Sequence, residues 1–113
     1  VLKSLKPSTR QRFVALELDF PPPEQELAIV VHESDLARER ARALVNLAVR
    51  LRELKGQDLE EAVSTRLLVY CARLMQAGMP VLQACRATLV EPLSDDADVR
   101  EGLMETIRAT FGG

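Results

Sequence analysis

The sequence predicts a mainly helical domain with one β-strand near its N-terminal end. Ala, Leu, Arg and Glu, which favour helix, are abundant. After residue 23, apolar residues recur at helical spacing, whereas a single earlier stretch alternates with the period of a strand. With 113 residues, 47% of them hydrophobic and 28% charged, the chain can bury one core. Aromatics make up only 4%, so we expect a core of mainly Leu, Val and Ala.

The segment 13–20, FVALELDF, is the predicted strand. One face carries the apolar side chains of Val14, Leu16, Leu18 and Phe20. Prolines at 21–23 end it, because proline cannot donate to a ladder and disfavours helix before it. A lone strand needs a neighbour for its backbone groups, and we find no second strand in the sequence. We therefore expect residues 13–20 to pair with another chain or with a sheet outside this sequence.

Two helices are expected directly after the prolines. The first, from Glu24 to about Glu33, carries Leu27, Val30 and Val31 on one stripe. The second, from Leu36 to Leu54, repeats apolar residues at i, i+3, i+4 and i+7, and Gly56 ends it.

Three further helices complete the prediction. Ser64 is a good N-cap for a helix that runs to Gln76. Pro80 suits the first turn of a helix that continues through Leu89. The segment 94–99, SDDADV, caps the last helix. The expected buried stripe of that helix is Val99, Leu103, Met104, Ile107 and Phe111.

Common catalytic signatures are absent from the sequence. It contains neither a GxxxxGK[ST] phosphate loop nor a GxGxxG motif. His32 is the one histidine, next to Glu33 at a helix end, so we expect a surface role and no metal site. Cys71 and Cys85 fall among apolar residues at helical spacing, and we expect two reduced core thiols.

Charge and hydropathy restrict the partners. The net charge of −2 gives no reason to expect nucleic-acid binding. Without a signal peptide or an apolar run that could span a bilayer, we expect no membrane insertion and, by default, a cytoplasmic location. The chain begins at Val1 rather than Met, which permits a longer parent, and the unpartnered strand leads us to expect a fragment.

The first arginine site lies just before the strand, in PSTRQRF. Arg10 and Arg12 form either a solvated basic turn or a guanidinium presented to a phosphate on a neighbouring subunit. Their chemistry alone leaves both interpretations open.

The second site is Arg66, in the first turn of the helix capped by Ser64. A helix N-terminus carries partial positive charge, so an arginine there is electrostatically misplaced. Either it pairs with Glu60 or Glu61, or Ser64, Thr65, Arg66 and the free N–H groups form an anion-binding corner.

Three segments carry a resemblance to a known family. They are LKPSTRQRFVALELDFPPP at 5–23, LKGQDLEEAVSTRLLVYCARL at 54–74 and ACRATLVEPLSDDADVREGL at 84–103. They closely resemble the C-terminal part of the MoxR-type AAA+ ATPases, in the subgroup of CbbQ, NirQ and NorQ, and the resemblance covers essentially the whole chain. It implies that residues 1–20 end the α/β ATPase core, with the strand as its last one. Residues 21–113 would then be a C-terminal helical lid domain, a five-helix AAA+ lid-type bundle.

The resemblance also implies roles for the arginines. Arg12 matches the arginine finger, with Arg10 as a close second candidate, and Arg66 matches the second-sensor arginine, with Ser64 and Thr65 beside it at the nucleotide. Many MoxR relatives have proline at the position of Thr65, whereas threonine is what the resemblance to the CbbQ, NirQ and NorQ subgroup leads us to expect. Cys71 stands where a small residue such as Ala is expected, which suits core packing.

The family further implies cofactors and partners. ATP and Mg²⁺ would be bound by the intact parent and not by this chain alone, which lacks the Walker motifs and is not expected to hydrolyse ATP. A homo-hexamer, a partner protein with a von Willebrand factor A-type domain, and a client enzyme such as rubisco or nitric oxide reductase are implied. The alternative is a stand-alone helical protein–protein interaction module, which a GxxxxGK[ST] motif upstream of Val1 would exclude.

Overall fold

A computed structural model describes residues 20–54 and 62–111 of the chain. Within these ranges the chain is helical, with no strand, which confirms the mainly α prediction. The helices are α2 (Pro23–Ser34), α3 (Arg38–Glu53), α4 (Thr65–Gln76), α5 (Val81–Cys85), the π-helical segment η2 (Arg86–Val90) and α6 (Ala97–Phe111). The predicted strand, apart from Phe20, and both Arg10 and Arg12 lie outside the described residues.

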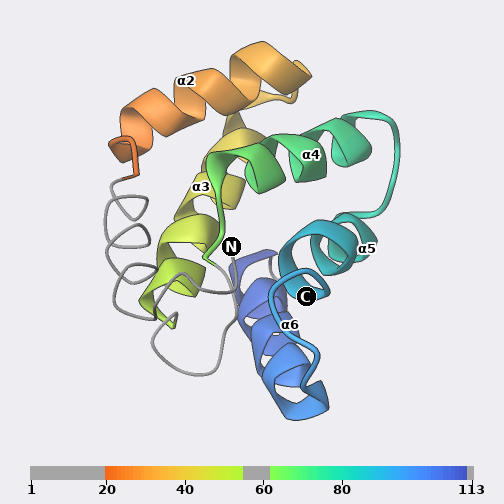
Figure 1. Ribbon diagram of the computed structural model, residues 1–113. Helices are drawn as coiled ribbons and strands as arrows, with labels where there is room; N and C mark the ends of the chain where they lie inside the picture. Colours follow the sequence, from red (N-terminus) through yellow and green to blue (C-terminus); the bar gives the residue numbers. More distant parts are fainter. Residues whose placement is uncertain (1–19, 55–61, 112–113) are drawn as a thin grey trace, which may run out of the picture.

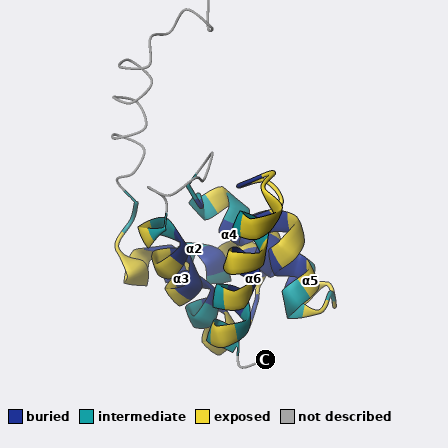
Figure 2. Ribbon diagram, turned by 90° about the horizontal axis from the view of Figure 1, so that it is seen from below, coloured by how far each residue is buried: buried dark blue, intermediate teal, exposed yellow. Residues whose placement is uncertain are grey.

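The helices pack as a bundle around α3 and α4 (Figure 1). α2 lies against both α3 and α4 at one end of the bundle, and α6 lies against α3, α5 and η2 at the other. α4 also packs against α5 and η2. Figure 2 shows that the buried faces of the helices point inward and the exposed faces outward, as amphipathic stripes require.

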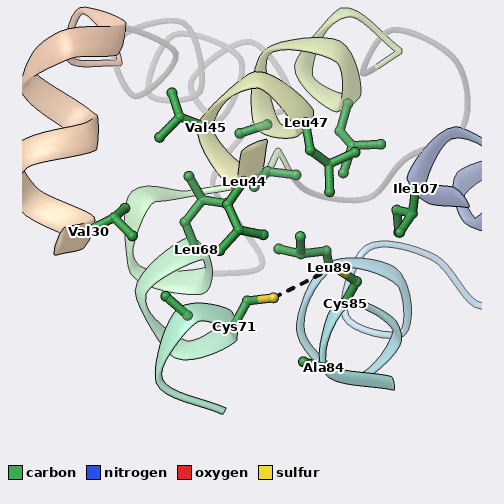
Figure 3. Packing of buried hydrophobic residues seen from close by; sticks show 14 of the residues in the cluster. Val30, Leu44, Val45, Leu47, Leu68, Cys71, Ala84, Cys85, Leu89 and Ile107 are labelled. Atoms are coloured by element: carbon green, nitrogen blue, oxygen red, sulfur yellow. Dashed lines mark hydrogen bonds between the residues drawn. The ribbon is translucent and has the colours of Figure 1, made fainter. Parts of the chain in front are cut away.

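One apolar core joins the helices (Figure 3). Its fully buried side chains include Leu44 and Leu47 of α3, Leu68 of α4, Leu89 of η2 and Ile107 of α6. Burying each such side chain contributes about 1.5–3 kcal/mol to stability. The predicted stripe of α6 is confirmed at its centre, where Leu103, Met104 and Ile107 are buried, whereas Val99 and Phe111 are only partly buried.

Side chains cap two helix starts as the sequence predicts. The Ser64 hydroxyl accepts a hydrogen bond from the Leu67 N–H at 3.2 Å. Asp96 Oδ1 accepts the N–H groups of Asp98 and Val99 at 2.8 and 3.0 Å. Each cap satisfies donors that have no partner within the helix. Ser64 therefore fixes the point at which α4 begins.

The C-terminal end of α4 is closed by a glycine in the left-handed region. Gly78 has φ of 108°. Its N–H donates to the Met75 carbonyl, and the Met79 N–H donates to the Leu74 carbonyl, both at 3.0 Å. This pair of bonds is the Schellman motif, which stops the helix and frees the chain to turn into α5.

The fourth predicted helix differs from expectation in its second half. Residues Arg86–Val90 form a π-helical turn, with the Glu91 N–H bonded to the Arg86 carbonyl at 3.0 Å. The hydroxyl of Thr88 donates to the Ala84 carbonyl at 2.8 Å, which gives that carbonyl a partner outside the regular ladder. The wide turn also buries Thr88, Leu89 and Val90 in succession, which a regular amphipathic stripe does not do.

Candidate functional site

The candidate site is the first turn of α4. Ser64 is the N-cap, Thr65 opens the helix, and Arg66 follows with its side chain exposed. The first N–H groups of a helix lack intrahelical acceptors, and the Ser64 hydroxyl takes the one from Leu67. The N–H groups at the start of a helix and the partial positive charge there are the features on which the predicted anion-binding role of this turn rests.

Arg66 forms no ion pair with any other residue in the ranges 20–54 and 62–111. Glu60 and Glu61, the two carboxylates that could neutralise it, lie outside those ranges. The salt-bridge interpretation from the sequence is therefore untested, as is the phosphate interpretation. What the structure does provide is a capped helix start with an exposed arginine on it.

A buried ion pair lies beneath this turn. The guanidinium of Arg52 on α3 donates from Nη1 and Nη2 to the two carboxylate oxygens of Glu26 on α2, at 2.9 and 2.7 Å. The side chain of Glu26 is only 1% exposed and that of Arg52 only 11%. The Thr65 hydroxyl donates to Glu26 Oε2 at 2.8 Å, so the carboxylate also holds the first residue of α4. A bidentate arginine–carboxylate pair of this kind has a fixed geometry.

Arg52 makes two further contacts. Its Nε donates to the carbonyl of Val63 at 2.9 Å, and its guanidinium carbon lies 3.8 Å from the centroid of the Phe20 ring. A cation over an aromatic face is attracted by the ring quadrupole. One side chain therefore joins the residue before the prolines, α2 and the segment that leads into α4. We refer to Phe20, Glu26, Arg52, Val63 and Thr65 as the Glu26–Arg52 network.

The sequence did not lead us to this network. One sequence feature could have indicated the network. Glu26 lies next to Leu27 and one helical turn before Val30, so it falls on the buried stripe of its helix. A charged residue on a core-facing stripe is almost always paired. Arg52 likewise follows Leu51, but nothing in the spacing shows that these two charges meet.

The remaining candidates behave as packing or surface residues. His32 lies in the last turn of α2 with its side chain 85% exposed and Nδ1 3.5 Å from Glu33 Oε2, as predicted. Cys71 and Cys85 are free and buried, which confirms two core thiols, and their sulfur atoms lie 3.8 Å apart between α4 and α5 (Figure 3). The hydrogen bond with Cys71, together with burial, raises the pKa of Cys85, which keeps that thiol protonated and a poor nucleophile.

No group of three or more His, Cys, Asp or Glu side chains in the described part of the chain could hold a metal ion. None of the helices described is both long and apolar enough to cross a membrane.

Comparison with known proteins places the chain in a family. The model of the CbbQ/NirQ/NorQ C-terminal family matches residues 26–110. The chain is 57% identical to Protein NorQ of Paracoccus denitrificans over 99% of its own length, and 52% identical to the denitrification regulatory protein NirQ of Pseudomonas aeruginosa over 95%. It is 46% identical to Protein CbbQ of Hydrogenophilus thermoluteolus over 97% of its length. It spans only 41–42% of the length of these relatives.

The family match covers Ser64, Thr65 and Arg66 as well as Glu26 and Arg52, so the candidate site and the ion pair beneath it both lie within the matched span. The identities extend along nearly the whole chain and agree with the resemblance seen in its motifs. The chain belongs to the CbbQ/NirQ/NorQ C-terminal family, the C-terminal region of a subgroup of MoxR-type AAA+ ATPases.

Proposed function

We propose that this chain supplies the lid and two arginine functions to ATP hydrolysis by a longer AAA+ ATPase. The observation that carries the proposal is Arg66, exposed in the capped first turn of α4 and inside the span matched by the family. The guanidinium and the helix-start N–H groups form a donor set that fits a phosphate. Arg66 would bind the nucleotide as the second sensor, with Ser64 and Thr65 shaping the turn.

Phosphoryl transfer requires little covalent work from the protein. Its main demands are the placement of the reacting groups and positive charge on the phosphate oxygens. ATP and Mg²⁺ would be bound by the rest of the parent protein, and the bond that breaks would be a phosphate bond of ATP. Arg66 would add positive charge from the lid, and its attachment to a helical domain would couple nucleotide state to lid position.

The arginine finger would come from the segment before the lid. We assign it to Arg12, with Arg10 as the second candidate, and both lie outside the described residues. A finger that reaches a neighbouring subunit would make hydrolysis depend on ring assembly, which is the reason for proposing a homo-hexamer. In this division residues 1–20 end the ATPase core and residues 21–113 form the lid.

The whole protein would remodel a client enzyme in the cytoplasm. One relative carries the name denitrification regulatory protein, and the family resemblance implies a client such as nitric oxide reductase or rubisco. A partner with a von Willebrand factor A-type domain would connect the ATPase to that client. These roles belong to the parent protein rather than to the lid by itself.

Substitution of Arg66 in the intact parent tests the sensor role. Arg66→Ala should weaken ATP binding about 10–100-fold, the effect expected when one hydrogen bond to a charged group is lost. Calorimetry or a fluorescent nucleotide measures the affinity. Arg40→Ala, which removes an exposed arginine from α3, should bind like wild type. If Arg66→Ala matches wild type in both ATP affinity and turnover, the sensor role is wrong.

Substitution of the finger candidates tests the other half of the proposal. Arg12→Ala should lower turnover about 10³-fold or more while ATP binding is kept, because a finger acts on the transition state. Arg10→Ala should do so instead if it is the finger. Turnover by the isolated chain above background would contradict the whole assignment, since the chain contains no phosphate-binding loop.

A further inference from the structure

We propose that Glu26 and Arg52 are positioning residues that set the orientation of Arg66 toward the nucleotide. The inference rests on the proposed sensor role of Arg66 and extends it to two buried residues on other helices. Neither residue would touch the nucleotide. Their effect would pass through Thr65 and Val63, which lie on the two sides of the cap residue Ser64.

The link from Thr65 to Glu26 determines how the first turn of α4 faces α2. Ser64 already caps the helix, so the Thr65 hydroxyl is not needed for capping. It instead donates to Glu26 Oε2 at 2.8 Å. The next residue in the chain is Arg66, so any rotation of this turn about the helix axis would move the guanidinium with it.

The link from Arg52 fixes the chain as it enters the helix. Nε of Arg52 holds the Val63 carbonyl at 2.9 Å while its two terminal nitrogens hold Glu26. Val63 is fully buried. The residues before and after Ser64 are thus bound to the same ion pair, which leaves the capped turn little freedom to shift.

The same guanidinium extends the network to Phe20. The ring lies 3.8 Å from the guanidinium carbon, directly before the prolines that lead into α2. Buried charges are costly when one partner moves away. Movement at the junction near Phe20 and movement at the start of α4 therefore act on one shared pair of charges.

A second ion pair between α2 and α4 provides a matched control. Arg73 near the end of α4 bonds to Glu33 at 3.1 Å, with side chains 52% and 46% exposed. It joins the same two helices but lies two turns away from Arg66 along α4. Arg73→Met removes this contact without disturbing the turn that carries the candidate site.

The test compares variants of the intact parent in two backgrounds, with Arg66 present and with Arg66→Ala. Thr65→Val and Glu26→Gln should each weaken ATP affinity about tenfold when Arg66 is present, the order of effect typical of an orienting partner. Neither should weaken it further in the Arg66→Ala background. Thr65→Ser, which keeps the hydroxyl, should have the ATP affinity of the wild type. Arg73→Met should leave the affinity unchanged in both backgrounds.

A merely structural role gives a different result. The variants would then lower the thermal unfolding midpoint without the tenfold loss of affinity, or would lose affinity equally in both backgrounds, and either result overturns the inference. If Arg66→Ala alone has no effect, the proposed function fails and the inference fails with it. If Glu26→Gln does not fold, Thr65→Val decides, because Thr65 is only partly buried and its replacement keeps the side-chain shape.

Discussion

Thr65 shows how one side chain can connect a local motif to the rest of the fold. Thr65 occupies the first position of α4, a position that proline also suits. A proline there could not donate to Glu26, whereas the threonine hydroxyl does so at 2.8 Å. The first residue of α4 is therefore hydrogen-bonded to a buried carboxylate on α2.

Glu24 offers a pH-dependent test at the residue scale. Hydrogen bonding and charge attraction from Arg42, with a smaller attraction from Arg38, lower the pKa of Glu24 below its usual 4.5. The folded pKa is lower than the unfolded one, so the stability from this pair is fully present above pH 4.5 and is lost as pH falls through the folded pKa. Glu24→Gln should therefore reduce the acid dependence of stability, measured by urea unfolding at several pH values.

The matching observation is the titration of the carboxyl group itself. NMR of the Glu24 side chain in the wild-type protein should give a pKa below 4.5. In the Arg42→Met variant this pKa should rise toward 4.5. An unchanged value in the variant would show that Arg42 does not stabilise the carboxylate.

At the scale of the elements, the sequence predicted the starts of α4 and α6 because side-chain caps have local causes. The hydroxyl of Ser64 and the carboxylate of Asp96 accept N–H groups at those two starts. The start of α3 was predicted less well, at Leu36 instead of Arg38. The π turn was not predicted, because it depends on the packing of Thr88, Leu89 and Val90 into a core formed by other helices. Periodicity describes one helix at a time, and it carries no information about such neighbours.

Two glycines allow a prediction about helix ends and interiors. Gly78→Ala should destabilise the protein by about 1 kcal/mol or more, because φ of 108° strains any residue with a Cβ. Gly102→Ala, in the exposed face of α6, should stabilise it by about 0.5–1 kcal/mol through helix propensity. A Cβ at either position would meet nothing within 4 Å, so the contrast isolates backbone conformation. Denaturant unfolding of both variants gives the comparison, and equal effects would contradict it.

At the scale of the whole molecule, the Glu26–Arg52 network joins parts of the chain whose contact could not be predicted from the sequence. The distance along the chain from Glu26 to Arg52 is 26 residues, and from Glu26 to Thr65 it is 39. Pairing over such separations depends on how α2, α3 and α4 pack. Local pattern and resemblance were enough to name Arg66 as a candidate site residue and Ser64 as its cap. The network that contacts the residues on both sides of Ser64 could be found only from the folded structure.

The ion pair also makes a prediction about global stability. Arg52→Met should cost about 3–5 kcal/mol, because it leaves the carboxylate of Glu26 buried without its partner. The double variant Glu26→Gln/Arg52→Met should recover part of that loss, since the uncompensated charge is gone. Chemical denaturation of the single and double variants measures the difference. A double variant as unstable as Arg52→Met would show that packing, not charge, is the cause.

The π turn at Arg86–Val90 has a consequence for how chain length varies among relatives. A π turn holds one residue more than an α turn, so a deletion within it can be absorbed by tightening the helix. Ala87 is exposed, and its removal would keep Cys85 and Leu89 at a spacing that still suits a buried helical face. Single-residue gaps in alignments of this family should therefore gather at this turn rather than within α3, where each deletion would rotate the following buried side chains toward water.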